Sequence, residues 1–461
     1  MAARAELPIR IFPALLLGVA VLLGLVAGAE PGLAVVAALG IAFVGLAMVN
    51  LTLGVCLFAV LSFLDTIFPS GSIVSAPKLI GLLLVLSWLG VLTTADPQRR
   101  PQVFSHPAFL GLLGAFIGWV ALSISWAEES GPVLTQLLRY VPNAMLFLIV
   151  FSAIRTREQA LMLVGAFVVG AFVSAVYGLI VPTDPAADGR LSGGAGNANE
   201  TAAVLVAGLM LAAALAAGLR REPLLRLLAA AAVPLCGLGL FLTLSRGGLA
   251  ALAAALVAAV AVAGRRRLVV LLAVLAAVGI GTVYFAAFAP AEARDRVTHI
   301  EGGTGRTDVW TVGWRIVEDK PVFGVGAGNF AGSTVHYLLE PGAILRSDFI
   351  VDTPKGAHNT YLEVLAELGV VGLAMFLAIL GFSVVCTLKA VRAFRDAGDA
   401  QLEILSRALF VALVGLLTAD FFGSKQFSKQ LWLLLSLGPA LLAIGRAQLA
   451  ERRSRDEALP G

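Results

Sequence analysis

The chain has 461 residues, of which 59% are hydrophobic and only 13% are charged. Soluble domains carry about 25% charged residues, so this composition excludes an ordinary soluble protein and indicates one that resides in a membrane. The net charge of +4 comes from basic residues spread along the chain, which does not favour nucleic-acid binding. Cys56, Cys236 and Cys386 all lie in apolar stretches, where they suit core packing rather than a disulfide or a metal site.

Long apolar stretches recur along the chain, and each is expected to be a helix because lipid offers no partner to open backbone groups. We therefore predict an all-α polytopic membrane protein with about 12–14 transmembrane helices. The predicted spans are 10–28, 32–49, 51–64, 77–94, 107–125, 133–154, 158–181, 199–219, 223–243, 247–264, 267–289, 361–388, 403–422 and 428–447. The first resembles a signal peptide but is long, and a second apolar run follows at once, so we expect it to be retained. The second and third share one apolar run, broken near Asn50, that suits either one long helix or a re-entrant pair.

Basic residues are concentrated in alternate connections between these spans, which identifies those connections as cytoplasmic. The set comprises Arg4, Arg10, Arg99, Arg100, Arg155, Arg157, Arg220, Arg221, Arg265, Arg266, Arg267, Lys389, Arg392, Arg395, Arg446, Arg452, Arg453 and Arg455. Both termini are then predicted to be cytoplasmic. On the opposite side, Arg190, Arg246, Arg306 and His358 break the rule and need a reason to be there.

A polar insert from Tyr284 to about Glu367 interrupts the apolar pattern on that opposite side. The spacing of Trp310, Trp314 and Val317 predicts a short helix over 306–318 that Lys320-Pro321 ends. Glycines at 324, 326 and 328 predict a flexible turn after it.

We expect five regions along the chain. They are an N-terminal transmembrane bundle, transmembrane helices with arginine-bearing external loops, a large external loop, C-terminal transmembrane helices and a charged, frayed cytoplasmic tail. Their bounds are 1–182, 183–289, 290–358, 359–447 and 448–461.

Two short connections place an arginine beside glycines at the membrane border. Leu244-Ser245-Arg246-Gly247-Gly248 joins two spans with almost no loop, where an unpaired arginine is costly. Arg246 therefore indicates an anion site, and snorkelling to lipid phosphates is the alternative. Arg190 precedes Gly196-Asn197-Ala198-Asn199-Glu200, in which an Asn caps a helix start that suits an anion. Capping explains the Asn and Gly residues but not Arg190.

Arg306 begins the predicted insert helix, where positive charge is unfavourable. A bound anion would explain this arginine, and an ion pair with Asp308 is the alternative. Trp310 and Trp314 share one face of that helix and also suit interfacial anchors.

His358 lies in Ala357-His358-Asn359-Thr360-Tyr361, where the insert re-enters the membrane. Glu363 and Glu367 follow, one helical turn apart. A histidine beside carboxylates suits a general base, whereas the capping residues around it also suit a hydrogen-bonded interfacial histidine.

Several motifs are missing. The external connections hold no Asp-x-Asp for a metal-bound diphosphate, and the chain has neither a phosphate-binding glycine loop nor a nucleophile elbow. We therefore predict neither metal nor cofactor. The spans also lack the buried acids of an ion-coupled pump.

Taken in order, these motifs resemble those of the O-antigen ligase and O-antigen polymerase family of bacterial envelope glycosyltransferases. The similar segments are Arg190 with Gly196-Asn197-Ala198-Asn199-Glu200, Ser245-Arg246-Gly247-Gly248, Gly305-Arg306-Thr307-Asp308-Val309-Trp310, Asp319-Lys320-Pro321-Val322-Phe323-Gly324-Val325-Gly326-Ala327-Gly328-Asn329-Phe330 and Ala357-His358-Asn359-Thr360-Tyr361-Leu362 with Glu367-Leu368-Gly369. They cover residues 185–380.

The resemblance implies a metal-independent, inverting transferase in the bacterial inner membrane, with its active site facing the periplasm. It would move a glycan from an undecaprenyl diphosphate carrier to a hydroxyl, with lipid A–core as the favoured acceptor. Arg190, Arg246 and Arg306 suit the diphosphate, because a guanidinium grips phosphate oxygens in pairs and stays charged. Asn199 and Trp310 are placed with them in the substrate site. His358 would orient or deprotonate the acceptor hydroxyl, with Glu363 and Glu367 behind it.

Other functions remain open at this point. A polymerase that joins repeat units and a ligase that glycosylates protein hydroxyls would share these motifs. A transporter of lipid-linked or anionic solutes would predict inverted repeats and broken helices at the midplane, and the sequence shows neither. Besides donor and acceptor, only membrane lipids are expected as partners.

Overall fold

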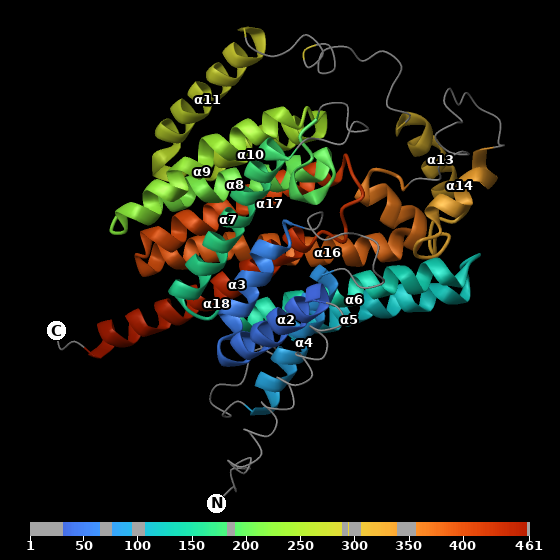
Figure 1. The fold of residues 1–461 in the computed structure, drawn as a ribbon, viewed down its shortest axis with the longest axis horizontal. Coiled ribbons are helices and arrows are strands. Elements are labelled where there is room, and N and C mark those ends of the chain that lie inside the picture. Colours follow the sequence, from blue (N-terminus) through green and yellow to red (C-terminus); the bar gives the residue numbers. More distant parts are fainter. Residues whose placement is uncertain are drawn as a thin grey trace, which may run out of the picture.

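The computed structural model describes residues 31–64, 76–94, 107–181, 190–287, 294, 306–338 and 356–458. All regular structure in these ranges is helical, which confirms the all-α prediction (Figure 1). The main helices are α2 (Pro31–Val49), α3 (Leu51–Leu61), α4 (Ala76–Thr94), α5 (Pro107–Leu122), α6 (Ser130–Ala153), α7 (Arg157–Ile180), α8 (Ala198–Gly218), α9 (Pro223–Leu242), α10 (Arg246–Val262), α11 (Arg267–Ala287), α13 (Arg306–Asp319), α14 (Phe330–Leu338), α16 (Thr360–Ala397), α17 (Ala400–Asp420) and α18 (Lys429–Ala458).

Every predicted span that falls in the described ranges corresponds to one of these helices, and span 10–28 lies outside them. Among the described residues, nine helices are long and apolar enough to cross a membrane, so the protein is a multi-pass membrane protein. The run at Asn50 is two helices rather than one, because the Asn50 side chain caps α3 by accepting from Leu53 N. With 11 residues, α3 is about 16 Å long and cannot cross a hydrocarbon core of about 30 Å alone.

Small residues let the central helices pack closely. A Cβ built on Gly208 of α8 would lie 2.5 Å from the Cβ of Ala171 on α7, and one built on Gly415 of α17 would lie 2.8 Å from Val206 Cγ1 on α8. Close backbone approach of this kind stabilises helix association in lipid, where the burial of apolar surface provides little driving force for helices to associate.

The helix α11 lies at the edge of the molecule (Figure 1). Its long apolar side chains point outwards, with Leu268 and Val269 each 68% exposed. In a membrane this surface would face the lipid chains, which makes α11 a peripheral span.

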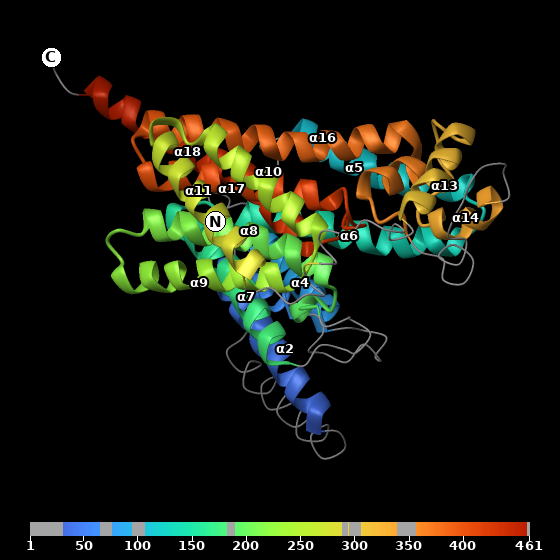
Figure 2. The same ribbon diagram turned by 90° about the horizontal axis from the view of Figure 1, so that it is seen from above.

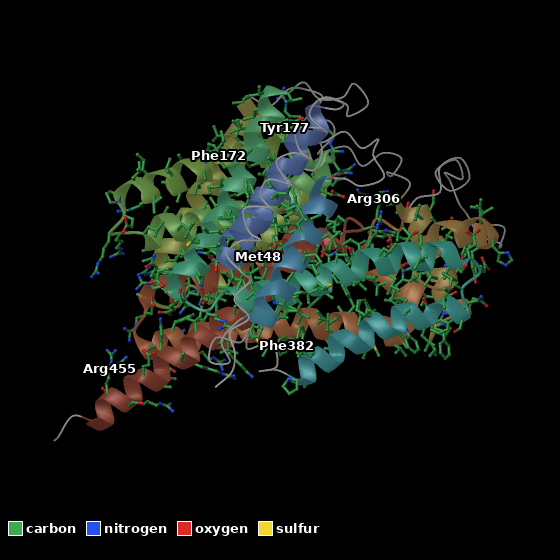
Figure 3. All side chains as sticks on the ribbon, turned by 60° about the horizontal axis from the view of Figure 1, so that its bottom comes forward. Met48, Phe172, Tyr177, Arg306, Phe382 and Arg455 are labelled. Carbon is green, nitrogen blue, oxygen red and sulfur yellow. The ribbon has the colours of Figure 1, made fainter. Side chains whose placement is uncertain are left out.

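The predicted insert helix is confirmed as α13, which ends at Asp319, just before Lys320-Pro321, and α14 follows a short turn. Both views place α13 and α14 together, beside the same ends of α5, α6 and α16 (Figures 1 and 2). Arg306 and Arg455 lie towards opposite ends of the molecule (Figure 3).

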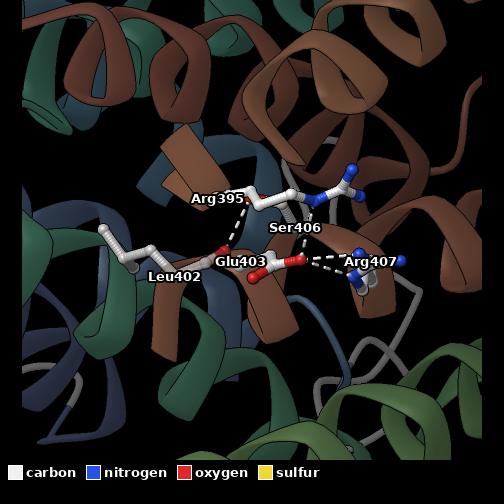
Figure 4. A network of polar contacts seen from close by, with 5 residues as sticks. All are labelled: Arg395, Leu402, Glu403, Ser406 and Arg407. Carbon is white, nitrogen blue, oxygen red and sulfur yellow. Dashed lines mark hydrogen bonds and ion pairs between the residues drawn. The ribbon is translucent and has the colours of Figure 1, made fainter. Parts of the chain in front are cut away.

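At the Arg455 end, a carboxylate ties two helices together. Glu403 Oε1 accepts from Arg395 Nε at 3.4 Å and from Arg407 Nη2 at 2.6 Å, which joins the end of α16 to α17 (Figure 4). Among the described residues, Arg157, Arg220, Arg266 and Arg452 lie together at the Arg455 end of the molecule.

Two details differ from the sequence prediction. The expected span 361–388 belongs to a longer helix, α16, that is interrupted at Gly369, where φ is 65° and ψ is −173°. The tail from Gln448, which its charge predicts to be frayed, continues α18 as helix to Ala458.

Candidate functional site

One amide side chain joins the two arginine-bearing connections. Arg190 Nη2 donates to Asn199 Oδ1 at 3.0 Å, and Ser245 Oγ donates to the same oxygen at 2.8 Å. Arg190 Nε also donates to the carbonyl of Thr243 at 2.9 Å. Asn199, in the first turn of α8, therefore fixes the Arg190 connection to the turn before α10.

Arg246 is the first residue of α10 and is exposed. Ser245 caps this helix by accepting from Gly248 N at 3.1 Å. Arg246 makes no hydrogen bond or ion pair with any residue that the structure describes, so its donors are available to a ligand.

Arg306 opens α13 and is half-buried. Burial lowers the pKa of Arg306, and the positive charge of Arg246 lowers it further, so the two guanidinium groups are within electrostatic range of each other. Two like charges within such a range are stabilised by an anion that both can bind.

Trp310 connects Arg306 to the histidine turn. It lies one turn after Arg306 on the same face of α13, and its Nε1 donates to the carbonyl of Ala357 at 2.9 Å. Its ring packs edge-to-face against Phe421, with 5.5 Å between ring centroids. In the described contacts Trp310 binds Ala357, the residue before His358, and therefore helps to position His358.

Backbone strain is concentrated at this site. Leu244 and His358 are the non-glycine residues with positive φ in the described part of the chain, at 48° and 49°. This conformation costs an L-residue about 1–2 kcal/mol. One residue lies just before Ser245-Arg246 and the other is the candidate base itself, a placement typical of functional sites.

Glu363 anchors the turn that carries His358. The carboxylate is 5% exposed, and its Oε2 accepts from Ala357 N at 2.9 Å and from Ser424 Oγ. Its Oε1 accepts from Gln426 Nε2 at 2.7 Å. The side chain thereby ties the start of α16 to the segment between α17 and α18.

Glu367 has a different set of partners. It is 3% exposed, and its backbone carbonyl accepts from Gly326 N at 2.8 Å. It therefore supports the glycine turn before α14. The two glutamates, one turn apart on α16, serve separate neighbours.

The α17–α18 connection, residues 421–428, completes the site and was missed by the sequence reading. Thr360 N and Oγ1 donate to the carbonyl of Gly423 at 3.1 and 2.8 Å, and Lys425 N donates to Thr360 Oγ1 at 2.8 Å. Lys425 Nζ donates to the carbonyl of Asn199 at 2.8 Å. The signal that could have found it is the one that marked the arginines, a basic residue on the side opposite the basic connections.

Helix starts meet at this cluster. Asn197 caps α8, Ser245 caps α10 and Asn359 caps α16, each with its side chain accepting from backbone N–H groups. The contacts through Asn199, Thr360 and Lys425 bring these three starts together. Helix starts carry partial positive charge and favour anions, so the termini and the arginines act in the same sense.

The contacts relate the predicted residues to one another in two groups. Arg190 and Asn199 form one with the turn before Arg246, whereas Trp310 and Glu363 both hold Ala357 beside His358. The α17–α18 connection joins the two groups. Among the described contacts, no hydrogen bond links the Glu367 side chain to either group. No cluster of three or more His, Cys, Asp or Glu suited to a metal occurs in the described ranges.

Comparison with known proteins shows which sequences this chain is similar to. Residues 230–377 match the family model described as O-antigen ligase. The chain is also similar to an O-antigen ligase of Pseudomonas aeruginosa, with 26% identity over 372 residues that cover 79% of this chain and 85% of that protein. The family match contains Arg246, Arg306 and His358, whereas Arg190, Asn199 and Lys425 lie outside it.

Proposed function

We propose that this chain, whose residues 230–377 belong to the O-antigen ligase family, moves a glycan from undecaprenyl diphosphate to a hydroxyl of lipid A–core. The family supports an enzyme that transfers lipid-linked glycans in general. The carrier, the acceptor and an inverting, metal-independent mechanism are our proposal, as is an active site on the periplasmic side of the inner membrane.

One observation carries the proposal, namely the gathering of cations and helix starts around Asn199. Arg190 and Ser245, in the turn before Arg246, both donate to the side-chain oxygen of Asn199. Arg306 is within electrostatic range of Arg246. A lipid-linked diphosphate brings several negative charges to the membrane border, and fixed guanidinium groups can bind its oxygens in pairs.

The proposed reaction is a single displacement at the anomeric carbon. The acceptor oxygen forms the new bond to this carbon from the face opposite the diphosphate, while the bond from the carbon to the diphosphate oxygen breaks. The electron pair leaves with the diphosphate, where Arg246 and Arg306 would stabilise the growing charge. His358 would accept the proton of the attacking hydroxyl, held in place by Trp310 and Glu363 through Ala357.

The test is glycan transfer by the purified protein with a synthetic polyprenyl diphosphate glycan and a lipid A–core acceptor. Arg246→Ala, Arg306→Ala and His358→Ala should each reduce transfer by at least about a hundredfold, because each removes a group that acts in the transition state. Arg265→Ala is the matched control, since Arg265 is exposed and belongs to a basic connection.

Near-normal transfer by all three variants would overturn the site assignment. Transfer should also persist in EDTA, and a strict metal requirement would contradict the proposed role of the arginines. Product analysis settles the acceptor: growth of carrier-linked chains, without transfer to lipid A–core, would replace the ligase by a polymerase.

A further inference from the structure

Lys425 is a buried cation outside the set that the sequence identified. Its side chain is 8% exposed, and its Nζ donates to the carbonyl of Asn199 at 2.8 Å. An ammonium has three donors, and a charge removed from water is costly unless compensated. Its position therefore needs an explanation beyond one backbone hydrogen bond.

Charged groups from several helices surround Lys425. Asp420 at the end of α17 and Glu200 in the first turn of α8 favour its charged form, and Arg306 of α13 opposes it. Asp420 is 1% exposed, and its Oδ2 has no hydrogen-bond partner among the described residues. No ion pair within 4.0 Å joins Asp420 to Lys425 in the described set, so a close salt bridge does not account for the buried ammonium.

The backbone of Lys425 belongs to the histidine side of the site. Its N–H donates to Thr360 Oγ1, next to Asn359 at the start of α16, and its neighbours Ser424 and Gln426 donate to Glu363. Its side chain belongs to the arginine side, through Asn199. Lys425 therefore bridges the residues that would handle the acceptor and those that would bind the diphosphate.

We infer that Lys425 is a positioning residue whose ammonium group fixes the first turn of α8, and with it the Asn199 side chain that Arg190 and Ser245 share, in the geometry that binds the donor diphosphate. This inference rests on the proposed function, and it adds that the protonation state of Lys425 controls donor binding. When the ammonium loses its proton, Asn199 loses a charge-assisted hydrogen bond and the site loses a positive charge.

The direction of the pH effect follows from the surroundings. Burial lowers the pKa of Lys425 to about 8, with Arg306 acting in the same sense and Asp420 and Glu200 opposing. The ammonium is therefore present below about pH 8 and is lost as the pH rises through that value. A bound diphosphate adds negative charge and favours the ammonium, so donor binding and protonation assist each other.

The experiment measures kcat and the donor KM of the full-length protein in lipid nanodiscs, from about pH 6.5 to about pH 9.5. In the parent protein the donor KM should rise up to about tenfold per pH unit above pH 8, while kcat at saturating donor changes little. Lys425→Met should have a high donor KM that no longer changes over this alkaline range. Lys425→Arg should keep a low donor KM to high pH, because a guanidinium stays charged.

Lys429→Met is the control, since Lys429 begins α18 and is not part of the proposed site. If Lys425→Met retains the parent's donor KM and pH profile, the inference is wrong. The donor KM of Lys425→Met tests the inference even if the larger arginine side chain of Lys425→Arg disturbs folding.

The two proposals fail separately. Full activity of Arg246→Ala and Arg306→Ala would remove the diphosphate site itself. Inactive arginine variants together with a parent-like Lys425→Met would leave the proposed function intact and remove only the role of Lys425.

Discussion

Trp310 shows how a residue that touches no reacting atom can determine activity. Its indole N–H satisfies the carbonyl of Ala357, which is fully buried beside His358. Without that donor a buried carbonyl is left without its partner, at a cost of about 1–3 kcal/mol. The strained backbone of His358 depends on such neighbours to keep its conformation.

We expect Trp310→Phe to lower kcat for glycan transfer about tenfold, because the ring is kept but the hydrogen bond is lost. Trp314→Phe is the matched control, since Trp314 lies on the same helix and is 54% exposed. Equal activity of the two variants would mean that the Ala357 contact does not position His358.

The sequence predicted the candidate arginines and His358 because all of them are charged or titratable groups on the side where the basic connections do not lie. It could not predict that Asn199 would join Arg190 to Ser245, since Ser245 lies in a separate connection, 46 residues further along the chain. Lys425 carried the same sequence signal and was overlooked. Its importance depends on a side-chain contact to a residue 226 positions away.

At the scale of elements, the insert is locked to α16 by glycines. Gly324, Gly326 and Gly328 have φ values of 69°, 94° and 75°, so the flexible turn expected from the sequence is instead a specific left-handed conformation. A Cβ on Gly324 would lie 2.4 Å from the backbone of Glu367. Gly369 lies on the facing side, where the absence of a side chain leaves room for the backbone of Val322. This close approach lets Val370 N donate to the carbonyl of Pro321 at 2.8 Å.

Gly369→Ala should destabilise the protein by several kcal/mol and abolish most transfer. The new Cβ would lie 1.9 Å from the carbonyl oxygen of Val322, and the φ of 65° is itself costly for alanine. Gly381→Ala is the control on the same helix, because nothing lies within 4 Å of its Cβ position. Thermal unfolding in detergent measures both, and a parent-like Tm for Gly369→Ala would contradict the packing described.

The helices themselves were largely predictable, since an apolar run long enough for the bilayer leaves few alternatives to a span. The break at Gly369 was not, because it serves a contact with Val322 in the insert. Contacts cross the proposed boundary at residue 358 between the external loop and the C-terminal helices, since Ala357 N donates to Glu363 and Val325 N to the carbonyl of Ala366. The first turns of α16 also pack against α13 through Leu362.

At the scale of the whole molecule, the proposed orientation places Arg306 outside and the basic connections in the cytoplasm. Arg306 and Arg455, one from each set, lie towards opposite ends of the molecule (Figure 3). An impermeant maleimide should therefore label Thr311→Cys in spheroplasts and Arg265→Cys only after lysis, because both positions are exposed. The background would carry Cys56→Ala, Cys236→Ala and Cys386→Ala, and the reverse labelling pattern would invert the topology.

The apolar pattern of the chain was enough to predict an all-α membrane protein, its membrane-spanning helices and the charged residues that are out of place. These properties follow from local composition, because the bilayer acts on each span separately. The contacts between helices reveal how distant connections share Asn199, how Trp310 and Glu363 hold the His358 turn, and that Lys425 joins the two. Those contacts arise from close packing of helices far apart in sequence, which no local pattern records.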